Sequence, residues 1–146
     1  KDIVPNSLIV RAGWMFGGGP GKDRKFVAKI IEQLENKKQI RVVTDKFGSP
    51  TFAKDLVNGI KLLIKGDEKG IFHLANTDVA SRYDIAKEIV EILGKDVEVI
   101  PAKSSEFGYM AARANREFLS SKLNIMRPWK EALREYLEVS WKEYFV

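Results

Sequence analysis

The sequence predicts an α/β protein whose strands and helices belong to one domain. Two patterns favour this class: short apolar runs rich in β-branched residues alternate with segments in which apolar residues recur every three or four positions. A chain of 146 residues is long enough to bury a core, and no repeat, low-complexity tract or flexible linker divides it. We therefore expect residues 1–146 to form a single unit.

In the first half of the chain we expect a strand at 7–16, a flexible glycine loop at 17–21, a helix at 25–34, a strand at 40–43 and a turn at 46–50. The strand is apolar and partly β-branched, whereas the helix carries Phe26, Ile30 and Leu34 on one face. Glycine and proline favour the turn. Thr51 is expected to cap the next helix, because its hydroxyl can accept a hydrogen bond from a terminal backbone N–H.

In the second half we expect a helix through 56–64, a strand at 70–75, a helix at 81–93, a strand at 97–100 and a helix at 129–145. Ser81 and Asp84 have the spacing of a capping box, and Gly94 is typical of a helix end. Pro101 is expected to end the fourth strand, since proline cannot donate a backbone hydrogen bond.

The charge balance is basic, with a net charge of +5 and an isoelectric point near 9.4. The lysines are scattered and interleaved with glutamate and aspartate, for example at 35–38 and 65–69. This pattern favours a solvated surface of mixed charge over a face for nucleic acid. A nucleic-acid module is the less favoured alternative, and it predicts binding that weakens strongly with salt.

Several classes of protein are excluded by composition. Cysteine is absent, so the chain has neither disulfides nor a thiolate metal site, and His73 is the only histidine. No apolar run approaches the roughly 18 residues that a membrane span needs. The first residues lack the pattern of a signal peptide. We expect a cytoplasmic protein without a metal, and we expect His73 to be structural.

Two motifs resemble a cofactor-binding loop and a catalytic pair, but we expect neither to have that role. The glycine loop lies between a strand and a helix, yet a G-x-G-x-x-G motif from Gly17 needs glycine at Lys22, and Pro20 removes a backbone donor. Tyr83 and Lys87 have the Y-x-x-x-K spacing of short-chain dehydrogenases, in which the lysine lowers the tyrosine pKa. This pair follows a capping residue on a helix with no cofactor strand before it, so we expect no catalytic role.

Several segments are distinctive when they are taken in order. Residues 48–51 read G-S-P-T, and 127–133 read R-P-W-K-E-A-L. Residues 11–17 read R-A-G-W-M-F-G, and 81–86 read S-R-Y-D-I-A. These segments resemble the C-terminal part of the dTDP-4-dehydrorhamnose reductase family, extended short-chain dehydrogenases with the motifs G-S-P-T, R-P-W-R-E-A-L, R-T-S-W-V-Y-G and S-W-Y-E-F-A. The resemblance covers nearly the whole chain.

The resemblance implies the C-terminal part of a Rossmann-like fold, with the cofactor-binding half missing upstream. The family's G-x-x-G-x-x-G loop and true Y-x-x-x-K lie in that half, so this chain is expected to bind no cofactor and to catalyse nothing alone. It begins almost inside a strand, and strand 7–16 is expected to pair with the missing half or with another copy, which makes a homo-oligomer possible.

For the intact protein the resemblance implies reduction of a dTDP-4-dehydro-6-deoxy-hexose by NADPH or NADH, the last step toward dTDP-L-rhamnose. This chain then supplies contacts to the dTDP-sugar, and neither nucleic acid nor membrane is a partner. The alternative is a non-catalytic, reductase-like subunit that binds a sugar nucleotide or regulates an enzyme. Intact upstream motifs favour the enzyme, whereas their loss favours the subunit.

The resemblance also suggests four substrate-binding residues. Trp14 offers an aromatic plane for a sugar or base, although it can also be a core tryptophan. Arg11 can pair with a diphosphate or with a carboxylate, and Arg113 can contact phosphate. Asp45 opens the stretch that shapes the nucleotide end of the pocket. Ala12 and Gly13 replace the family's usual Thr-Ser, which removes two hydroxyls.

Overall fold

The computed structural model describes residues 6–108 and 114–144. Its strands are β1 (Leu8–Ala12), β2 (Trp14–Phe16), β3 (Gln39–Val43), β4 (Phe47–Gly48), β5 (Pro50–Phe52), β6 (Gly70–Leu74), β7 (Ala80–Ser81), β8 (Glu98–Ala102) and β9 (Arg116–Glu117). Its α-helices are α1 (Gly19–Lys22), α2 (Phe26–Asn36), α3 (Ala53–Lys65), α4 (Arg82–Leu93) and α5 (Trp129–Ser140), and 3₁₀ turns cover Ser104–Phe107 and Lys142–Tyr144. The alternation of strands and helices confirms the α/β class.

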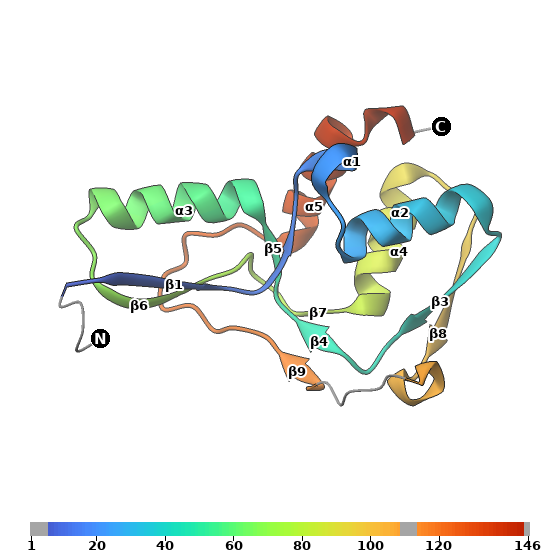
Figure 1. Ribbon diagram of the computed structural model, residues 1–146, viewed down its shortest axis with the longest axis horizontal. Coiled ribbons are helices and arrows are strands. Elements are labelled where there is room, and N and C mark those ends of the chain that lie inside the picture. The colour runs from blue at the N-terminus through green and yellow to red at the C-terminus, as the bar shows by residue number, and fades with distance from the viewer. Residues whose placement is uncertain (1–5, 109–113, 145–146) are drawn as a thin grey trace.

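The strands form short sheets that join an arm to a lobe (Figure 1). In the arm, β1 pairs in parallel with β6 beside α3. In the lobe, β3 pairs in parallel with β8 next to α2 and α4. Between them, β2 pairs in parallel with β5, and β4 lies between antiparallel β7 and parallel β9. The connection between arm and lobe therefore passes through β2, β4 and β5.

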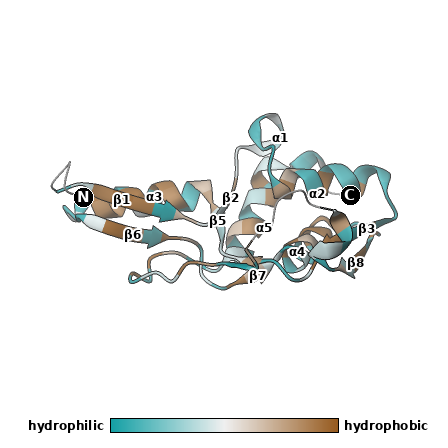
Figure 2. Ribbon diagram, turned by 60° about the horizontal axis from the view of Figure 1, so that its bottom comes forward, coloured by the Kyte–Doolittle hydropathy of each residue, from teal (hydrophilic) through white to brown (hydrophobic). Residues whose placement is uncertain are grey.

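The core of the lobe is apolar and lies between α2, α4 and α5. Its members are fully or nearly fully buried side chains such as Ile31, Ile89, Leu133 and Leu137. By contrast, β1 and β6 of the arm are largely hydrophobic (Figure 2), and Ile9 and Ile71 stay 36% and 44% exposed. Within the described part of the chain, β1 and β6 pair only with each other, so the outer edge of each lacks a strand partner there.

The sequence predicts one continuous strand at 7–16, but the structure interrupts it at Gly13. Gly13 separates β1 from β2, and its N–H donates to the Thr51 hydroxyl at 3.2 Å. A Cβ atom at Gly13 would lie 2.2 Å from the Ser49 carbonyl oxygen. The break is therefore a site of close backbone approach, where only glycine fits without displacement.

Thr51 is not the helix cap that the sequence predicts. It lies inside β5, and α3 begins two residues later at Ala53 without a side-chain cap. Its hydroxyl accepts from the Gly13 N–H and donates to the Ser49 carbonyl at 3.2 Å. The Thr51 hydroxyl, which we expected to cap the helix, therefore forms tertiary hydrogen bonds instead.

Pro101 does not end the fourth strand but lies within it, opposite Val42. Among the described strands β8 pairs only with β3, so β8 is an edge strand in this part of the chain. An edge tolerates proline because the missing donor faces away from the pairing partner. The last helix is also shorter than expected, since α5 ends at Ser140.

The helix signals around α4 are confirmed. The Ser81 hydroxyl accepts from the Asp84 N–H at 3.1 Å, and the Asp84 carboxylate accepts from the Ser81 N–H at 2.8 Å. Gly94 ends the helix in the left-handed region with φ of 62°. None of the helices in the described ranges is both long and apolar enough to cross a membrane.

The glycine loop lies partly at the surface, as predicted, since Gly18, Pro20 and Gly21 are exposed, but a buried network anchors it at Gly19. Residues 19–22 form the short helix α1, and the following Asp23 is 3% exposed. The Tyr136 hydroxyl accepts from the Gly19 N–H at 3.1 Å and donates to the Asp23 carboxylate at 2.9 Å. Burial, the largest influence, raises the pKa of Tyr136, so the phenol stays protonated as the donor in this network.

Candidate functional site

Two adjoining cavities of about 290 and 430 Å³ lie where β2, α2 and α4 meet. Together we call them the Trp14 cavity, because Trp14, Lys25, Phe26 and Arg82 line both. The remaining described lining residues are Met15, Phe16, Val27, Lys29, Val43, Lys46, Pro50, Ile85, Ala114, Glu117, Trp129 and Leu133. The smaller cavity is mostly apolar, whereas charged groups surround the larger one.

Trp14 forms one wall and is held at its backbone and at its indole. Its N–H donates to the Ser49 carbonyl at 2.8 Å, and its indole Nε1–H donates to the Glu117 carboxylate at 2.8 Å. A Cβ atom at Gly48 would lie 2.3 Å from the indole ring. Gly48 therefore lets the ring lie directly against the β4 backbone.

The G-S-P-T segment is the support for this wall. The Ser49 hydroxyl accepts from the Leu119 N–H at 3.0 Å, which ties the segment to the chain after β9. Pro50 lines the smaller cavity beside Trp14, and Thr51 holds the break at Gly13. Every residue of the segment thus has a structural contact that shapes the cavity.

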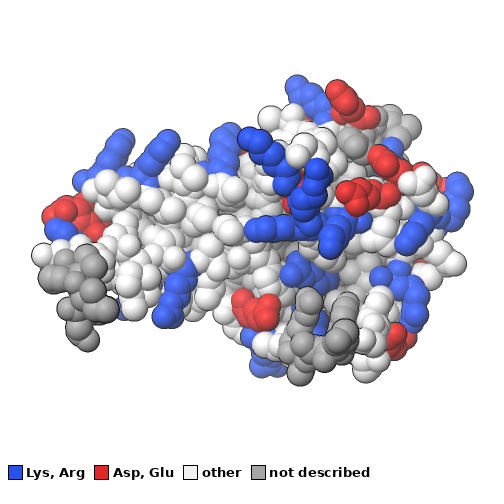
Figure 3. Space-filling view, viewed as in Figure 1, with Lys and Arg blue, Asp and Glu red and all other residues white. Residues whose placement is uncertain are grey.

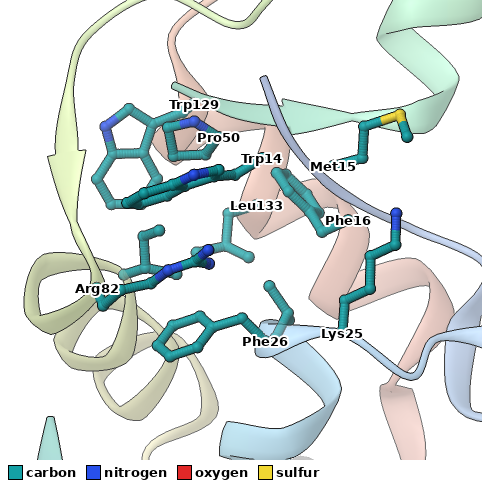
Figure 4. Close-up of a pocket in the computed structure, with 11 residues that line it drawn as sticks. Trp14, Met15, Phe16, Lys25, Phe26, Pro50, Arg82, Trp129 and Leu133 are labelled. Atoms are coloured by element: carbon teal, nitrogen blue, oxygen red, sulfur yellow. The ribbon is translucent and has the colours of Figure 1, made fainter. Parts of the chain in front are cut away.

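Arg82, the first residue of α4, lies between two aromatic rings (Figure 4). Its guanidinium carbon is 3.6 Å from the Trp14 ring centroid and 4.6 Å from the Phe26 ring centroid. Cations at such distances are attracted by the ring faces. The three side chains form a stack that reaches from β2 across α4 to α2.

The charges around the larger cavity are mostly positive. Lys25, Lys29, Lys46 and Arg82 line it, with Glu117 as the described carboxylate. Figure 3 shows lysine and arginine side chains gathered near the middle of one face, around the start of α2. Lys46 also donates to the Asn115 side-chain oxygen at 2.7 Å. A cavity with aromatic and cationic walls suits a planar or sugar group that carries an anion.

Of the three predicted site residues that the structure describes, Trp14 lines this cavity, whereas Arg11 and Asp45 do not. Arg11 is exposed on β1, where it pairs in register with His73. The ion pairs among the described residues do not include Arg11, so its predicted carboxylate partner is not found there. Arg113 lies outside the described residues. The structure therefore separates Arg11 from Trp14, although they are three positions apart.

Asp45 has a structural partner in this fold. Its carboxylate accepts from the Ser104 N–H at 3.0 Å and from the Ser104 hydroxyl at 2.9 Å. Burial raises the pKa of Asp45, but the hydrogen bonds from Ser104 outweigh it and lower the pKa below its usual value. The carboxylate thus fixes the turn after β8, while the neighbouring Lys46 lines the cavity.

The arginine of the R-P-W segment does not line the cavity. Arg127 binds the Asp55 carboxylate with two nitrogens, at 2.8 and 3.0 Å, and Glu135 at 2.6 Å. Asn76 donates to Asp55 at 2.8 Å, and Lys54 lies 2.6 Å from Glu135. This network joins α3 to α5 and gives the arginine a structural role. Trp129, in contrast, is buried and lines the smaller cavity.

Neither the glycine loop nor the Tyr83–Lys87 pair has the contacts of a nicotinamide site. The Gly19 N–H, in the only glycine cluster of the sequence, already donates to Tyr136. Tyr83 is partly buried on α4, and the Lys87 ammonium lies over its ring at 5.9 Å.

No group of three or more histidine, aspartate or glutamate side chains in the described ranges could hold a metal ion. His73 contacts the Ser120 carbonyl oxygen at 3.0 Å.

Arg82, Lys25 and Glu117 are cavity residues that sequence reasoning missed. Arg82 stands where the resembling family has tryptophan in S-W-Y-E-F-A, and this exchange of an aromatic for a cation was the available signal. Lys25 and Glu117 carried no comparable signal, because charged residues at element ends are common on surfaces.

The fold is that of the C-terminal part of an extended short-chain dehydrogenase. Solved dTDP-4-dehydrorhamnose reductases match it closely: the enzyme from Yersinia enterocolitica has a TM-score of 0.83 and 39% identity over 90% of this chain and 48% of its own. The enzyme from Bacillus anthracis, solved in complex with NADP, has a TM-score of 0.82 and 31% identity over the same shares.

The chain belongs to the RmlD substrate-binding-domain family, whose model matches residues 1–141. The dTDP-4-dehydrorhamnose reductase of Mycolicibacterium smegmatis is 38% identical over 90% of this chain and 42% of its own length. The chain spans about half the length of the curated relatives it matches. The resemblance inferred from the motifs is thereby confirmed.

Proposed function

We propose that this chain forms the sugar-nucleotide-binding part of an NADPH- or NADH-dependent reductase of a dTDP-4-dehydro-6-deoxy-hexose, in dTDP-L-rhamnose synthesis. The observation that carries the proposal is the Trp14 cavity, with an indole wall beside four cationic side chains. A dTDP-sugar has the matching parts, namely a sugar, a planar base and a diphosphate. The family and its named relatives support the same substrate.

Each proposed contact follows from the position of a side chain. The Trp14 indole contacts the sugar or the base with the rim that lines the cavity, since Gly48 and Arg82 cover its faces and Glu117 fixes its orientation. The cations around the larger cavity offset the charge of the diphosphate. Arg11, Asp45 and Arg113 remain proposed substrate contacts. A contact from Asp45 would have to form while its carboxylate also accepts the hydrogen bond from the Ser104 hydroxyl.

The reductase needs groups that this chain does not contain. We propose that the cofactor loop and the proton-donating tyrosine belong to another half of the same protein, which packs beside the arm. The uncovered edge of β1 and the exposed Ile9 and Ile71 support a partner there. Homo-oligomer formation and a cytoplasmic location stay predictions.

Two assays test the proposal. The full natural protein that contains this chain is expected to oxidise NADPH or NADH when a dTDP-4-dehydro-6-deoxy-hexose is added, whereas residues 1–146 alone are expected not to. Sustained reduction by residues 1–146 alone would contradict the assignment of the catalytic groups. Tight binding of the dTDP-sugar without any turnover by the full protein would instead favour a non-catalytic binding subunit.

A further inference from the structure

A hydrogen bond joins the Trp14 indole to a strand that lies 103 positions further along the chain. Glu117 is the last residue of β9, which pairs in parallel with β4, so Glu117 lies opposite Gly48 (Figure 1). Its Oε2 accepts from the Trp14 Nε1–H at 2.8 Å. The ion pairs within the described ranges do not include Glu117, so the indole is the partner that this carboxylate has there.

Ser49 brings Trp14 and β9 together, because its backbone binds one of them and its side chain the other. Its carbonyl accepts from the Trp14 N–H at 2.8 Å, and its hydroxyl accepts from the Leu119 N–H at 3.0 Å. Glu117 lies shortly before Leu119 in the chain, so these bonds set it beside the indole. None of them uses the Glu117 side chain, and the strand is therefore expected to stay in place when that side chain is shortened.

The contacts on the ring faces do not by themselves fix which rim of the indole lines the cavity. Gly48 lies so close to the ring that a Cβ atom there would be 2.3 Å away, and the Arg82 guanidinium carbon is 3.6 Å from the ring centroid. These contacts restrict the plane of the ring. The ring can still be turned over within that plane, because the last torsion of an aromatic side chain is broad and roughly two-fold. The bond to Glu117 selects the orientation that directs Nε1–H toward β9.

We propose that Glu117 is a positioning residue of the reductase, which acts through Trp14 on the orientation of the bound sugar nucleotide. This inference rests on the proposed function, which supplies the ligand. The bond is exposed, and such a bond contributes little to stability, since water can replace either partner. Its contribution is to geometry, because a substrate reacts more slowly when a contact that orients it is displaced.

Substitutions in the full natural protein test this role by kinetics and by stability. Glu117→Ala is expected to lower kcat/KM for the dTDP-4-dehydro-6-deoxy-hexose about threefold to fivefold, with little change in the midpoint of urea unfolding. Glu117→Gln is expected to restore most of the activity, since its amide oxygen can still accept from the indole. Arg116→Ala is the matched control. It changes an exposed residue of the same strand, whose side chain lies on the opposite face from Glu117.

Nuclear magnetic resonance reports the bond itself through the Nε1–H signal of Trp14, which Trp14→Phe assigns. Glu117→Ala is expected to shift this signal, whereas Glu117→Gln is expected to leave it close to its wild-type position. An unshifted signal in Glu117→Ala would overturn the inference, because the bond would be absent in solution. A shifted signal with unchanged kcat/KM would also overturn it, as would failure of Glu117→Gln to restore activity.

The same measurements separate this inference from the proposed function. Loss of the effect of Glu117 in a wild-type protein that reduces the dTDP-sugar would overturn the inference alone. A wild-type protein that reduces no dTDP-sugar would overturn the proposed function and the kinetic part of the inference. The indole signal would then still decide whether Glu117 orients Trp14.

Discussion

Two partly buried arginines of this molecule have opposite surroundings. Arg127 faces Asp55 and Glu135, which hold it at distances of 2.6 to 3.0 Å and raise the pKa of the guanidinium, first of all through the hydrogen bonds to Asp55. Arg82 lies over the rings of Trp14 and Phe26 in a cavity that three lysines also line. The carboxylates around Arg127 balance its charge within the fold.

The comparison separates an arginine that is paired with carboxylates from one that is stacked between aromatic rings. The Arg127 cluster joins α3 to α5, so its contribution is to the stability of the fold. The described lining of the cavity around Arg82 includes three lysines and the carboxylate of Glu117. How distinctive a sequence motif is does not tell the two arginines apart. Arg127 is structural although it belongs to the R-P-W segment, which is the more distinctive in sequence.

The largest expected effect comes from Arg127→Met. Removing the guanidinium leaves Asp55, whose side chain is 12% exposed, without its bidentate partner. Loss of one partner of a largely buried pair is strongly destabilising, and because Arg127 is itself 31% exposed we expect about 2 to 3 kcal/mol. Urea unfolding followed by circular dichroism measures this loss, and dTDP affinity of the folded variant is expected to change little.

Arg134→Met is the control for this substitution. Arg134 and Glu138 are about half exposed and 4.0 Å apart, so this change is expected to cost less than about 0.5 kcal/mol. Equal destabilisation by the two substitutions would contradict a special role for the Arg127 cluster and would break the comparison.

Trp14→Ala tests the other region. In the full natural protein it is expected to lower kcat/KM by roughly tenfold or more, because the stack with Arg82 and the cavity wall are lost. Steady-state kinetics measure this, with Tyr83→Phe as the control that is expected to change kcat/KM little. Normal kinetics for the tryptophan variant, or an inactive tyrosine variant, would show that the site lies elsewhere.

The smallest expected effect is a pH dependence in the Arg127 cluster. Hydrogen bonds from Lys54 and then Arg127 hold the pKa of Glu135 below its ordinary value of 4.5. A depressed folded pKa stabilises the protein above that ordinary value, and this stabilisation is lost as pH falls through the folded pKa. We therefore expect stability to fall below about pH 4.5 less steeply in Glu135→Gln than in the wild type. Parallel unfolding curves at pH 3 to 6 would contradict this.

Some signals that are complete within a few residues were read correctly from the sequence, although the signal of Pro101 as a strand end was not. The capping box needs only Ser81, Asp84 and the backbone between them, so its spacing was enough to predict it. Gly94 ends α4 for a similarly local reason, since its left-handed conformation suits glycine. The order of strands and helices likewise follows from local periodicity.

Signals that depend on distant partners were not readable. Thr51 has the residue type of a cap, but its hydroxyl is used by Gly13, which is 38 positions away in sequence. The cavity shows the same limit, because Trp14, Arg82 and Lys25 come from separate elements and their convergence is a tertiary property. Asp45 and Arg11 were chosen for their positions in motifs, and neither position reveals where the side chain points.

The bond between the glycine loop and Tyr136 also orders events during synthesis. Gly19 and Asp23 leave the ribosome long before their partner, which follows 117 and 113 residues later. Until α5 is made, the Asp23 carboxylate has to stay hydrated, because burying it without the phenol would be costly. A contact of such long range closes late and slowly. The buried contact of the glycine loop therefore forms only after α5 has been made.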